Sequence, residues 1–211
     1  MLWGEGIFKR TIYKIEELEK DMDITDLQLL EQESIQRGIP ILGSAKGEWL
    51  LNFILEHKPR RVLELGTANG YSGCILGSAG AELTTIDINQ VIVKEAEENF
   101  TLRGVKATII VGNGVEIVGQ MAKREKFLEY YDLIFIDFAK KQYLTVLEDC
   151  LRLVVRGGYI IADNITMGGC LDFKERVMQD ARLVTELIEI KDGLSCSWKK
   201  NSGNFDKRKI I

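Results

Sequence analysis

Histidine and proline are scarce in this sequence, and its cysteines are dispersed. The 211 residues include one histidine, His57, and two prolines, Pro40 and Pro59. No two of the four cysteines form a CxxC pair; they are Cys74, Cys150, Cys170 and Cys196. Structural zinc sites need closely spaced cysteine and histidine ligands, so this pattern excludes a zinc centre and favours reduced thiols.

Long apolar runs and an excess of basic charge are also missing. The longest apolar stretch, residues 50–55, is interrupted by Asn52 and is far too short to span a bilayer. The first 20 residues mix charged with apolar side chains, so we expect no signal peptide, no membrane partner and a cytoplasmic location. The net charge of -4 disfavours nucleic acid as an obligatory partner. The C-terminus has a local basic run, interpreted as a solvated tail, that comprises Lys199, Lys200, Lys207, Arg208 and Lys209.

The chain contains no internal repeat, low-complexity stretch or linker, which favours one domain over residues 1–211. We expect N-terminal helices over 1–58, an α/β core over 59–200 and a tail over 201–211. Residues 12–37 are predicted to form two helical pieces, with Thr25 and Gln28 as a capping box that starts the second. Apolar residues at helical spacing predict a further helix over 44–57.

From residue 60 onward, short strands alternate with stretches of helical length. Predicted strands cover 61–65, 82–87, 106–111, 132–137 and 158–162, with helices such as 91–103 and 141–155 between them. Strands this rich in valine, isoleucine and leucine are typical of a parallel sheet covered by helices on both faces. Residues 183–191 and 194–200 add an antiparallel hairpin around the turn Asp192-Gly193. The prediction is therefore an α/β fold with a mostly parallel seven-stranded sheet.

The segment after the first predicted strand has the features of a cofactor site. Glu64 ends the strand, and Gly66 and Gly70 permit a tight turn before the next helix. Ala68 stands where a dinucleotide fingerprint has its second glycine, which disfavours a pyrophosphate. Asp87, at the end of the second strand, is placed to bind a ribose diol. This set favours S-adenosylmethionine, although loop hydrogen bonds to Glu64 and helix capping by Asp87 would also explain the acids.

Two later strands also end in oxygen-bearing side chains. Asp137 follows one strand, and Asp163 and Asn164 follow the next. Two carboxylates and an amide form a hard ligand set, suited to Mg²⁺ above all and also to Ca²⁺ or Mn²⁺. Lys140 lies three residues beyond Asp137, where it could act as a base on a nearby hydroxyl. Helix capping and loop hydrogen bonds are the alternative roles for these acids.

Taken together, these segments resemble the metal-dependent, class I S-adenosylmethionine-dependent O-methyltransferases, the catechol and caffeoyl-CoA O-methyltransferase family. Residues 64–72 read E-L-G-T-A-N-G-Y-S, residues 137–143 read D-F-A-K-K-Q-Y, and residues 192–194 read D-G-L. The resemblance spans about residues 38–200. It implies a Rossmann-like class I methyltransferase fold. The cofactor-binding residues it implies are Glu64, Gly66, Thr67, Gly70, Tyr71, Ser72, Asp87, Ile88, Asn113 and Asp137.

The resemblance also implies the chemistry. Asp137, Asp163 and Asn164 are expected to bind the divalent metal, with Lys140 as the catalytic base, in methyl transfer to a hydroxyl of a catechol-like or other vicinal-diol small molecule. Family members are often dimers, so a homodimer is a further expectation. The chain departs from the family where D-A-D-K is common, because Ala139 replaces the second acid, and Asn113 stands where aspartate is frequent.

Three other functions are compatible with parts of this pattern. A methyltransferase acting on a hydroxylated nucleotide of tRNA would use the same chemistry, with the basic C-terminus guiding the phosphates. A non-catalytic cofactor-binding module would have no need of the aspartates, the asparagine and Lys140 together. A nicotinamide-dependent dehydrogenase is disfavoured by Ala68 and by the Asp163-Asn164 pair.

Overall fold

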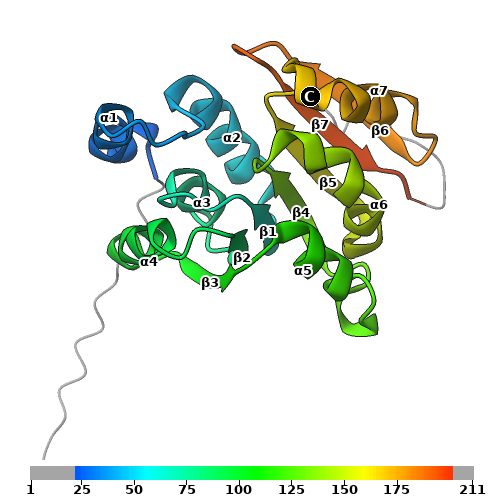
Figure 1. Cartoon of the computed structure of the whole chain (residues 1–211), viewed down its shortest axis with the longest axis horizontal. Helices are drawn as coiled ribbons and strands as arrows, with labels where there is room; N and C mark the ends of the chain where they lie inside the picture. The colour runs from blue at the N-terminus through cyan, green and yellow to red at the C-terminus, as the bar shows by residue number, and fades with distance from the viewer. Residues whose placement is uncertain (1–21, 202–211) are drawn as a thin grey trace, which may run out of the picture.

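The computed structural model describes residues 22–201, which are built around one seven-stranded sheet (Figure 1). The first helical piece predicted within residues 12–37 therefore lies largely outside the described residues. The strand order is β3-β2-β1-β4-β5-β7-β6, with β1 to β5 parallel and β7 antiparallel to both β5 and β6. The strands are β1 (Arg61–Leu65), β2 (Glu82–Asp87), β3 (Lys106–Val111), β4 (Tyr131–Ile136), β5 (Val154–Asp163), β6 (Leu183–Ile188) and β7 (Leu194–Lys199).

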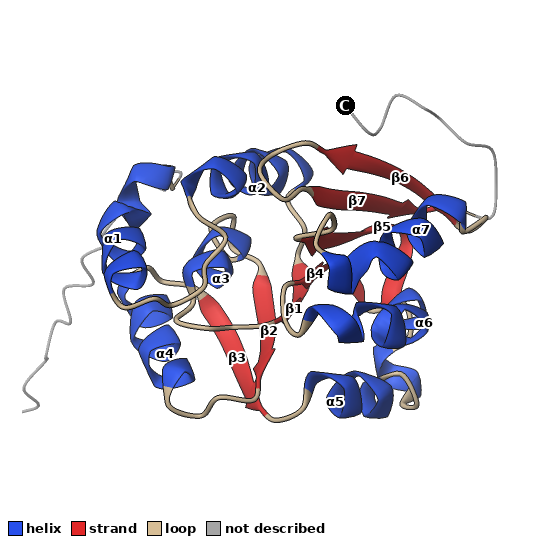
Figure 2. Ribbon diagram, turned by 45° about the horizontal axis from the view of Figure 1, so that its top comes forward, coloured by secondary structure: helices blue, strands red, loops and turns tan. Residues whose placement is uncertain are grey.

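Helices cover both faces of the sheet, with α1 to α4 on one side and α5 to α7 on the other (Figure 2). Alternate residues of each central strand pack into two hydrophobic cores, one on each face of the sheet. In β4, for example, Leu133 and Phe135 pack with the first group, whereas Ile134 and Ile136 pack with the second. The helices are α1 (Gln28–Gln36), α2 (Ser44–His57), α3 (Tyr71–Leu76), α4 (Ile92–Leu102), α5 (Gly114–Met121), α6 (Tyr143–Leu153) and α7 (Leu171–Gln179). No helix among the described residues is long and apolar enough to cross a membrane.

The sequence predictions of the fold are confirmed, with small errors in the limits of some elements. The first three strands and the helix over 44–57 match their predicted bounds. The strand β5 begins at Val154 rather than at residue 158, so the end of the helix predicted over 141–155 is strand. Val154 pairs with Tyr131, and the register then shifts before Leu133 pairs with Tyr159. Two glycines, Gly157 and Gly158, lie in this irregular stretch. Because glycine weakens a strand interior, the sequence did not predict a strand there.

The capping box predicted at Thr25 and Gln28 is wrong, because the box lies two residues earlier, at Asp23 and Asp26. The Asp23 side chain accepts from the Thr25 N–H at 2.9 Å, and the Asp26 side chain accepts from the Asp23 N–H at 3.1 Å. This box opens a short 3-10 helix, Ile24–Leu27, which leads into α1. Aspartate satisfies the free N–H groups of a helix start better than threonine does, which explains why the box forms at Asp23 and not at Thr25.

The carboxyl ends of β1 and β4 come unusually close together at the point where the strand order reverses. Asp137 donates its backbone N–H to the Leu65 carbonyl at 2.8 Å. Gly66 has a φ of +105°, and a Cβ placed on it would lie 2.0 Å from the Asp137 carbonyl oxygen. Only glycine fits there. Open α/β sheets bind their ligands at this reversal point, so Gly66 shapes the edge where a site is expected.

Replacing Gly66 with alanine should destabilise the fold more than the same change at Gly80. Gly80 also has a positive φ, +79°, but nothing lies within 4 Å of an added Cβ. Gly80→Ala should therefore lower the free energy of unfolding by about 1 kcal/mol, the cost of left-handed backbone alone. Gly66→Ala adds a steric clash and should cost about 3 kcal/mol or more. Urea denaturation of both variants measures the difference, and equal losses would contradict the close approach.

Candidate active site

A cavity of about 490 Å³ opens at the carboxyl edge of the parallel strands. Its walls come from the loops that follow β1 to β4 and from residues 40–42, which precede α2. Most of the predicted site residues line it, namely Gly66, Thr67, Tyr71, Ser72, Asp87, Ile88, Asn113, Asp137 and Lys140. The volume is in the range of small-molecule and cofactor pockets.

Glu64 and Gly70 were predicted to bind the cofactor, but they lie beneath the cavity lining. The Glu64 carboxylate is fully buried and accepts hydrogen bonds of 2.6 Å from the hydroxyls of Ser72 and Thr85. Gly70 precedes α3, and a Cβ there would approach the Phe100 ring to 2.9 Å. Both residues hold the loop after β1 in place instead of facing the cavity.

Asp87 fixes the same loop from the neighbouring strand. One of its carboxylate oxygens, Oδ2, accepts from the N–H groups of Thr67 at 3.0 Å and Ala68 at 2.9 Å. The other, Oδ1, accepts from the Asn89 N–H at 2.8 Å. Helix capping was the alternative role considered for Asp87, but the N-cap of α4 is Val91, and Asp87 instead binds loop N–H groups while it also lines the cavity. The same carboxylate therefore shapes the loop and contributes to the cavity lining.

Apolar side chains surround the end of the cavity near Asp87. Ile88 is 72% exposed although it lines the pocket, and Phe138 forms part of the wall. The Phe138 ring stacks on Tyr143 with 5.7 Å between centroids. Asn113 lines the cavity and caps α5 by accepting from the Val115 N–H at 3.0 Å. A flat heteroaromatic ring would match these surfaces.

Asp137 and Lys140 form an ion pair at the wall formed by the loop after β4. The Lys140 Nζ lies 2.5 Å from Asp137 Oδ1 and 3.2 Å from the Tyr143 hydroxyl. Burial, reinforced by the charge of Asp137, raises the pKa of the Tyr143 phenol far above its ordinary value. The phenol therefore stays protonated, and it serves to hold the amine of Lys140 rather than to exchange a proton with it.

Asp163 and Asn164 lie beside Asp137, as the sequence predicted. Asp137 and Asp163 directly follow Ile136 and Ala162, which are paired in the ladder between β4 and β5. Burial, together with the negative charge of Asp137, raises the pKa of Asp163. Neither Asp163 nor Asn164 lines the cavity itself. The two acids thus lie side by side at its edge, each paired with a lysine.

The oxygens at this edge fit a hard divalent cation. Within residues 22–201, no three histidine, cysteine or carboxylate side chains gather closely enough to hold a metal. A cation would therefore need the amide oxygen of Asn164 in addition to Asp137 and Asp163. Carboxylate and amide oxygens are the ligands that Mg²⁺ and Ca²⁺ prefer, so the donor set agrees with the expected metal.

The sequence reasoning missed the partners of these residues. Lys46 of α2 is 1% exposed and forms ion pairs with both Asp163 and Asp192. Asp192 had been identified only as a turn residue. A lysine four residues before Leu50 and seven before Phe53, on the apolar face of the helix, was the available signal.

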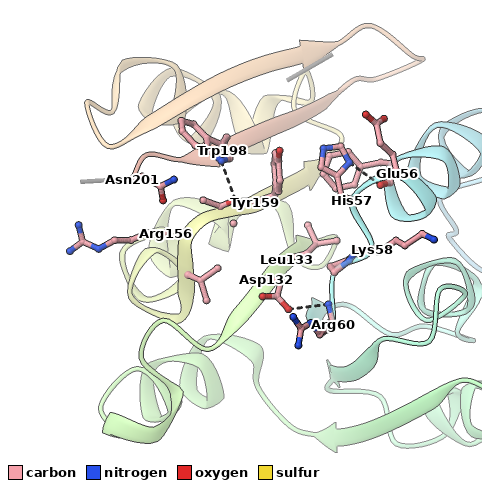
Figure 3. A pocket seen from close by; sticks show the side chains of 15 residues that line it. Glu56, His57, Lys58, Arg60, Asp132, Leu133, Arg156, Tyr159, Trp198 and Asn201 are labelled. Carbon is pink, nitrogen blue, oxygen red and sulfur yellow. Dashed lines mark hydrogen bonds between the residues drawn. The ribbon is translucent and has the colours of Figure 1, made fainter. Parts of the chain in front are cut away.

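A second hollow, of about 580 Å³, lies at the opposite edge of the sheet (Figure 3). It adjoins the amino ends of β1 and β4, and none of the predicted site residues lines it. Asp132 there accepts from the backbone N–H groups of Arg60 at 3.0 Å and Arg61 at 2.9 Å. Because parallel sheets bind ligands at their carboxyl ends, the smaller cavity is the better candidate for the active site.

Similarity to known proteins shows the family of this chain. An O-methyltransferase family model matches residues 25–200. The chain belongs to the O-methyltransferase family. Catechol O-methyltransferase of Mus musculus is 31% identical over 140 residues, which cover 63% of this chain and 52% of that protein. Catechol O-methyltransferase of Sus scrofa is 28% identical over 178 residues, covering 77% of this chain and 95% of the relative.

The matched region spans about half the length of several curated relatives, 52% in Mus musculus and 54% in Bos taurus. Among solved structures, the O-methyltransferase TomG from Streptomyces achromogenes superposes with a TM-score of 0.75 at 21% identity. That match covers 88% of this chain and 93% of TomG, which was solved in complex with S-adenosylmethionine. The likeness supports the class I fold of this chain.

Glu64 should make the stability of this protein depend on pH. Burial raises the pKa of Glu64 to about 8, whereas an unfolded glutamate titrates near about 4.3. The folded protein therefore binds more protons than the unfolded chain between these values. The stabilisation is complete below the unfolded pKa and is lost as the pH rises through about 8.

Glu64→Gln removes this titration while keeping the size of the side chain. The free energy of unfolding, measured by urea denaturation from pH 5 to pH 9, should fall with pH more steeply for the wild type than for the variant. Parallel curves for the two proteins would show that Glu64 does not titrate in this window.

Proposed function

We propose that this chain is an S-adenosylmethionine-dependent O-methyltransferase that methylates a hydroxyl of a catechol-like or other vicinal-diol small molecule, assisted by Mg²⁺. The observation that carries the proposal is that one cavity brings together Asp87, exposed Ile88 and the Asp137–Lys140 pair. The first two suit a nucleoside, and the pair suits an acceptor hydroxyl. The catechol O-methyltransferase relatives support the same substrate class.

The loop after β1 and the loop after β2 would hold the methyl donor. Gly66 allows the backbone to approach it closely, Asp87 faces its ribose, and Ile88 and Phe138 enclose its ring. S-adenosylmethionine supplies an activated methyl group, whose bonding electron pair to sulfur stays on the sulfur when the acceptor oxygen takes the carbon. The chain's task is then mainly to align oxygen, carbon and sulfur.

Asp137, Asp163 and Asn164 would hold the metal. A divalent cation bound there supplies positive charge, which favours both an ionised acceptor hydroxyl and a neutral Lys140 amine. Three protein ligands leave coordination positions for the oxygens of a diol. Lys140, kept in place by Asp137 and by the neutral phenol of Tyr143, takes the hydroxyl proton on Nζ.

Lys140→Met should lower kcat by roughly 10²- to 10⁴-fold, because a positioned base contributes about that much. Lys141→Met is the matched control, since Lys141 is the exposed neighbour in the same short helix, Lys140–Gln142. Transfer of label from S-adenosylmethionine to a catechol panel measures both variants. Equal rates for the two would exclude Lys140 as the base.

The same assay with chelator, and with Asp163→Ala, separates the alternative functions. Turnover that chelator and the variant both abolish supports metal-assisted methylation of a diol. No turnover despite cofactor binding would favour a large acceptor, which a salt-dependent gel shift with tRNA would detect.

Of the basic C-terminal residues, Lys199 and Lys200 donate to backbone carbonyls, and Lys207, Arg208 and Lys209 lie outside the described residues. Binding of NAD in place of S-adenosylmethionine would overturn the proposal.

A further inference from the structure

Three segments far apart in the sequence meet behind the proposed metal ligands. The Lys46 side chain, 1% exposed near the start of α2, donates to Asp163 at the end of β5 and to Asp192 in the turn between β6 and β7. Its partners are 117 and 146 residues away along the chain. A buried ammonium costs free energy unless it is fully paired, so this arrangement needs an explanation.

Lys46 leaves one particular oxygen of Asp163 available. The Asp163 Oδ1 atom accepts from Lys46 and also from the backbone N–H of Asn164 at 2.7 Å. Within residues 22–201, no donor is directed at Oδ2. The carboxylate is therefore held by one oxygen, and the other remains free to bind a cation.

Asp192 orients the amide of Asn164 in a similar way. Asn164 has a φ of +57°, a left-handed conformation that asparagine tolerates better than most residues. Its Nδ2 donates to Asp192 Oδ2, while Asp192 Oδ1 accepts from Lys46. Since a carboxylate only accepts, the amide must turn its nitrogen toward Asp192, which leaves Oδ1 for a cation.

We propose that Lys46 and Asp192 are positioning residues for the metal centre, which they hold as one hydrogen-bonded unit. The inference rests on the proposed function, because it assumes that Asp163 and Asn164 bind a metal. A nearby ammonium would by itself repel a divalent cation, so its benefit must come from orienting the ligands. Residues outside the ligand set that orient metal ligands typically change metal affinity by about 10- to 100-fold when they are mutated.

Hydrogen bonds to the backbone should preserve the local fold when the Lys46 or Asp192 side chain is replaced, so the positioning role can be tested by mutation. Thr166 donates its N–H to the Asp192 carbonyl at 3.1 Å and its hydroxyl to the same carbonyl at 2.8 Å. These bonds join the loop after β5 to the hairpin turn independently of the Asp192 side chain. Lys46→Met keeps an unbranched chain of similar length on α2, and Asp192→Asn keeps the size of the side chain. Both variants are therefore expected to fold.

The experiment measures the dissociation constant of Mn²⁺ by electron paramagnetic resonance on the full chain. Lys46→Met and Asp192→Asn should each weaken Mn²⁺ binding by about 10- to 100-fold. The double variant should be little weaker than either single one, because the two residues act as a unit. Binding of S-adenosylmethionine without metal, measured by calorimetry, should stay within about twofold of wild type.

Lys199→Met is the matched control. Lys199 is also mostly buried, and it donates to the carbonyls of Leu151 and Val154 at 2.9 and 2.8 Å, near the amino end of β5. This variant should lower the melting temperature and leave the affinity for Mn²⁺ unchanged.

Unchanged or tighter Mn²⁺ binding by Lys46→Met would overturn the positioning role, even if its melting temperature falls. Failure of the wild-type protein to bind Mn²⁺ would overturn this inference and the metal-assisted function together. Binding by the wild type that is lost in Asp163→Ala but unaffected by Lys46→Met would overturn this inference alone.

Discussion

The close approach of β1 and β4 at their carboxyl ends is the constraint on which the rest of the site depends. Gly66 allows it, because the backbone of Asp137 occupies the space that a side chain would need. The same contact places the loop after β1 directly beside Asp137 and Lys140. A nucleoside held by that loop would therefore have its reactive end next to the ion pair. The proximity of donor and acceptor sites is thus a property of the sheet, not of flexible side chains.

Electrostatic balance is the second requirement at this edge. Asp137, Asp163 and Asp192 bring three carboxylates together, and only Lys140 and Lys46 are paired with them. The raised pKa of Asp163, caused by burial and then by Asp137, reflects the resulting repulsion. Asp192 differs, since hydrogen bonds from Lys46 and Asn164 outweigh its burial and lower its pKa. Three carboxylates against two ammonium groups leave one net negative charge at this edge, which a cation on the proposed ligands Asp137 and Asp163 would neutralise.

Local patterns predicted the architecture, and most of the site residues that they indicated line the cavity, because strand ends in a parallel sheet share one edge. The location of Asp137, Asp163 and Asp87 at one edge of the sheet followed from their positions at the ends of parallel strands. The position of Glu64 could not be predicted this way, since a buried carboxylate bonded to Ser72 and Thr85 has the same sequence pattern as a cofactor ligand. Lys46 was missed for another reason: its partners are more than 100 residues away, and no local rule predicts which acid a buried lysine meets.

The departures from the family pattern change the character of the cavity wall. Where many family members carry a second acid, this chain has Ala139, and Phe138 beside it stacks on Tyr143. Tyr143 in turn packs edge-on against Phe173, with 5.5 Å between ring centroids, so the wall is backed by a rigid aromatic core. Such a wall binds a ring by shape and stacking rather than by charge. Because this wall is the one proposed to enclose the ring of the methyl donor, recognition of the acceptor would depend instead on the charged edge at Asp137.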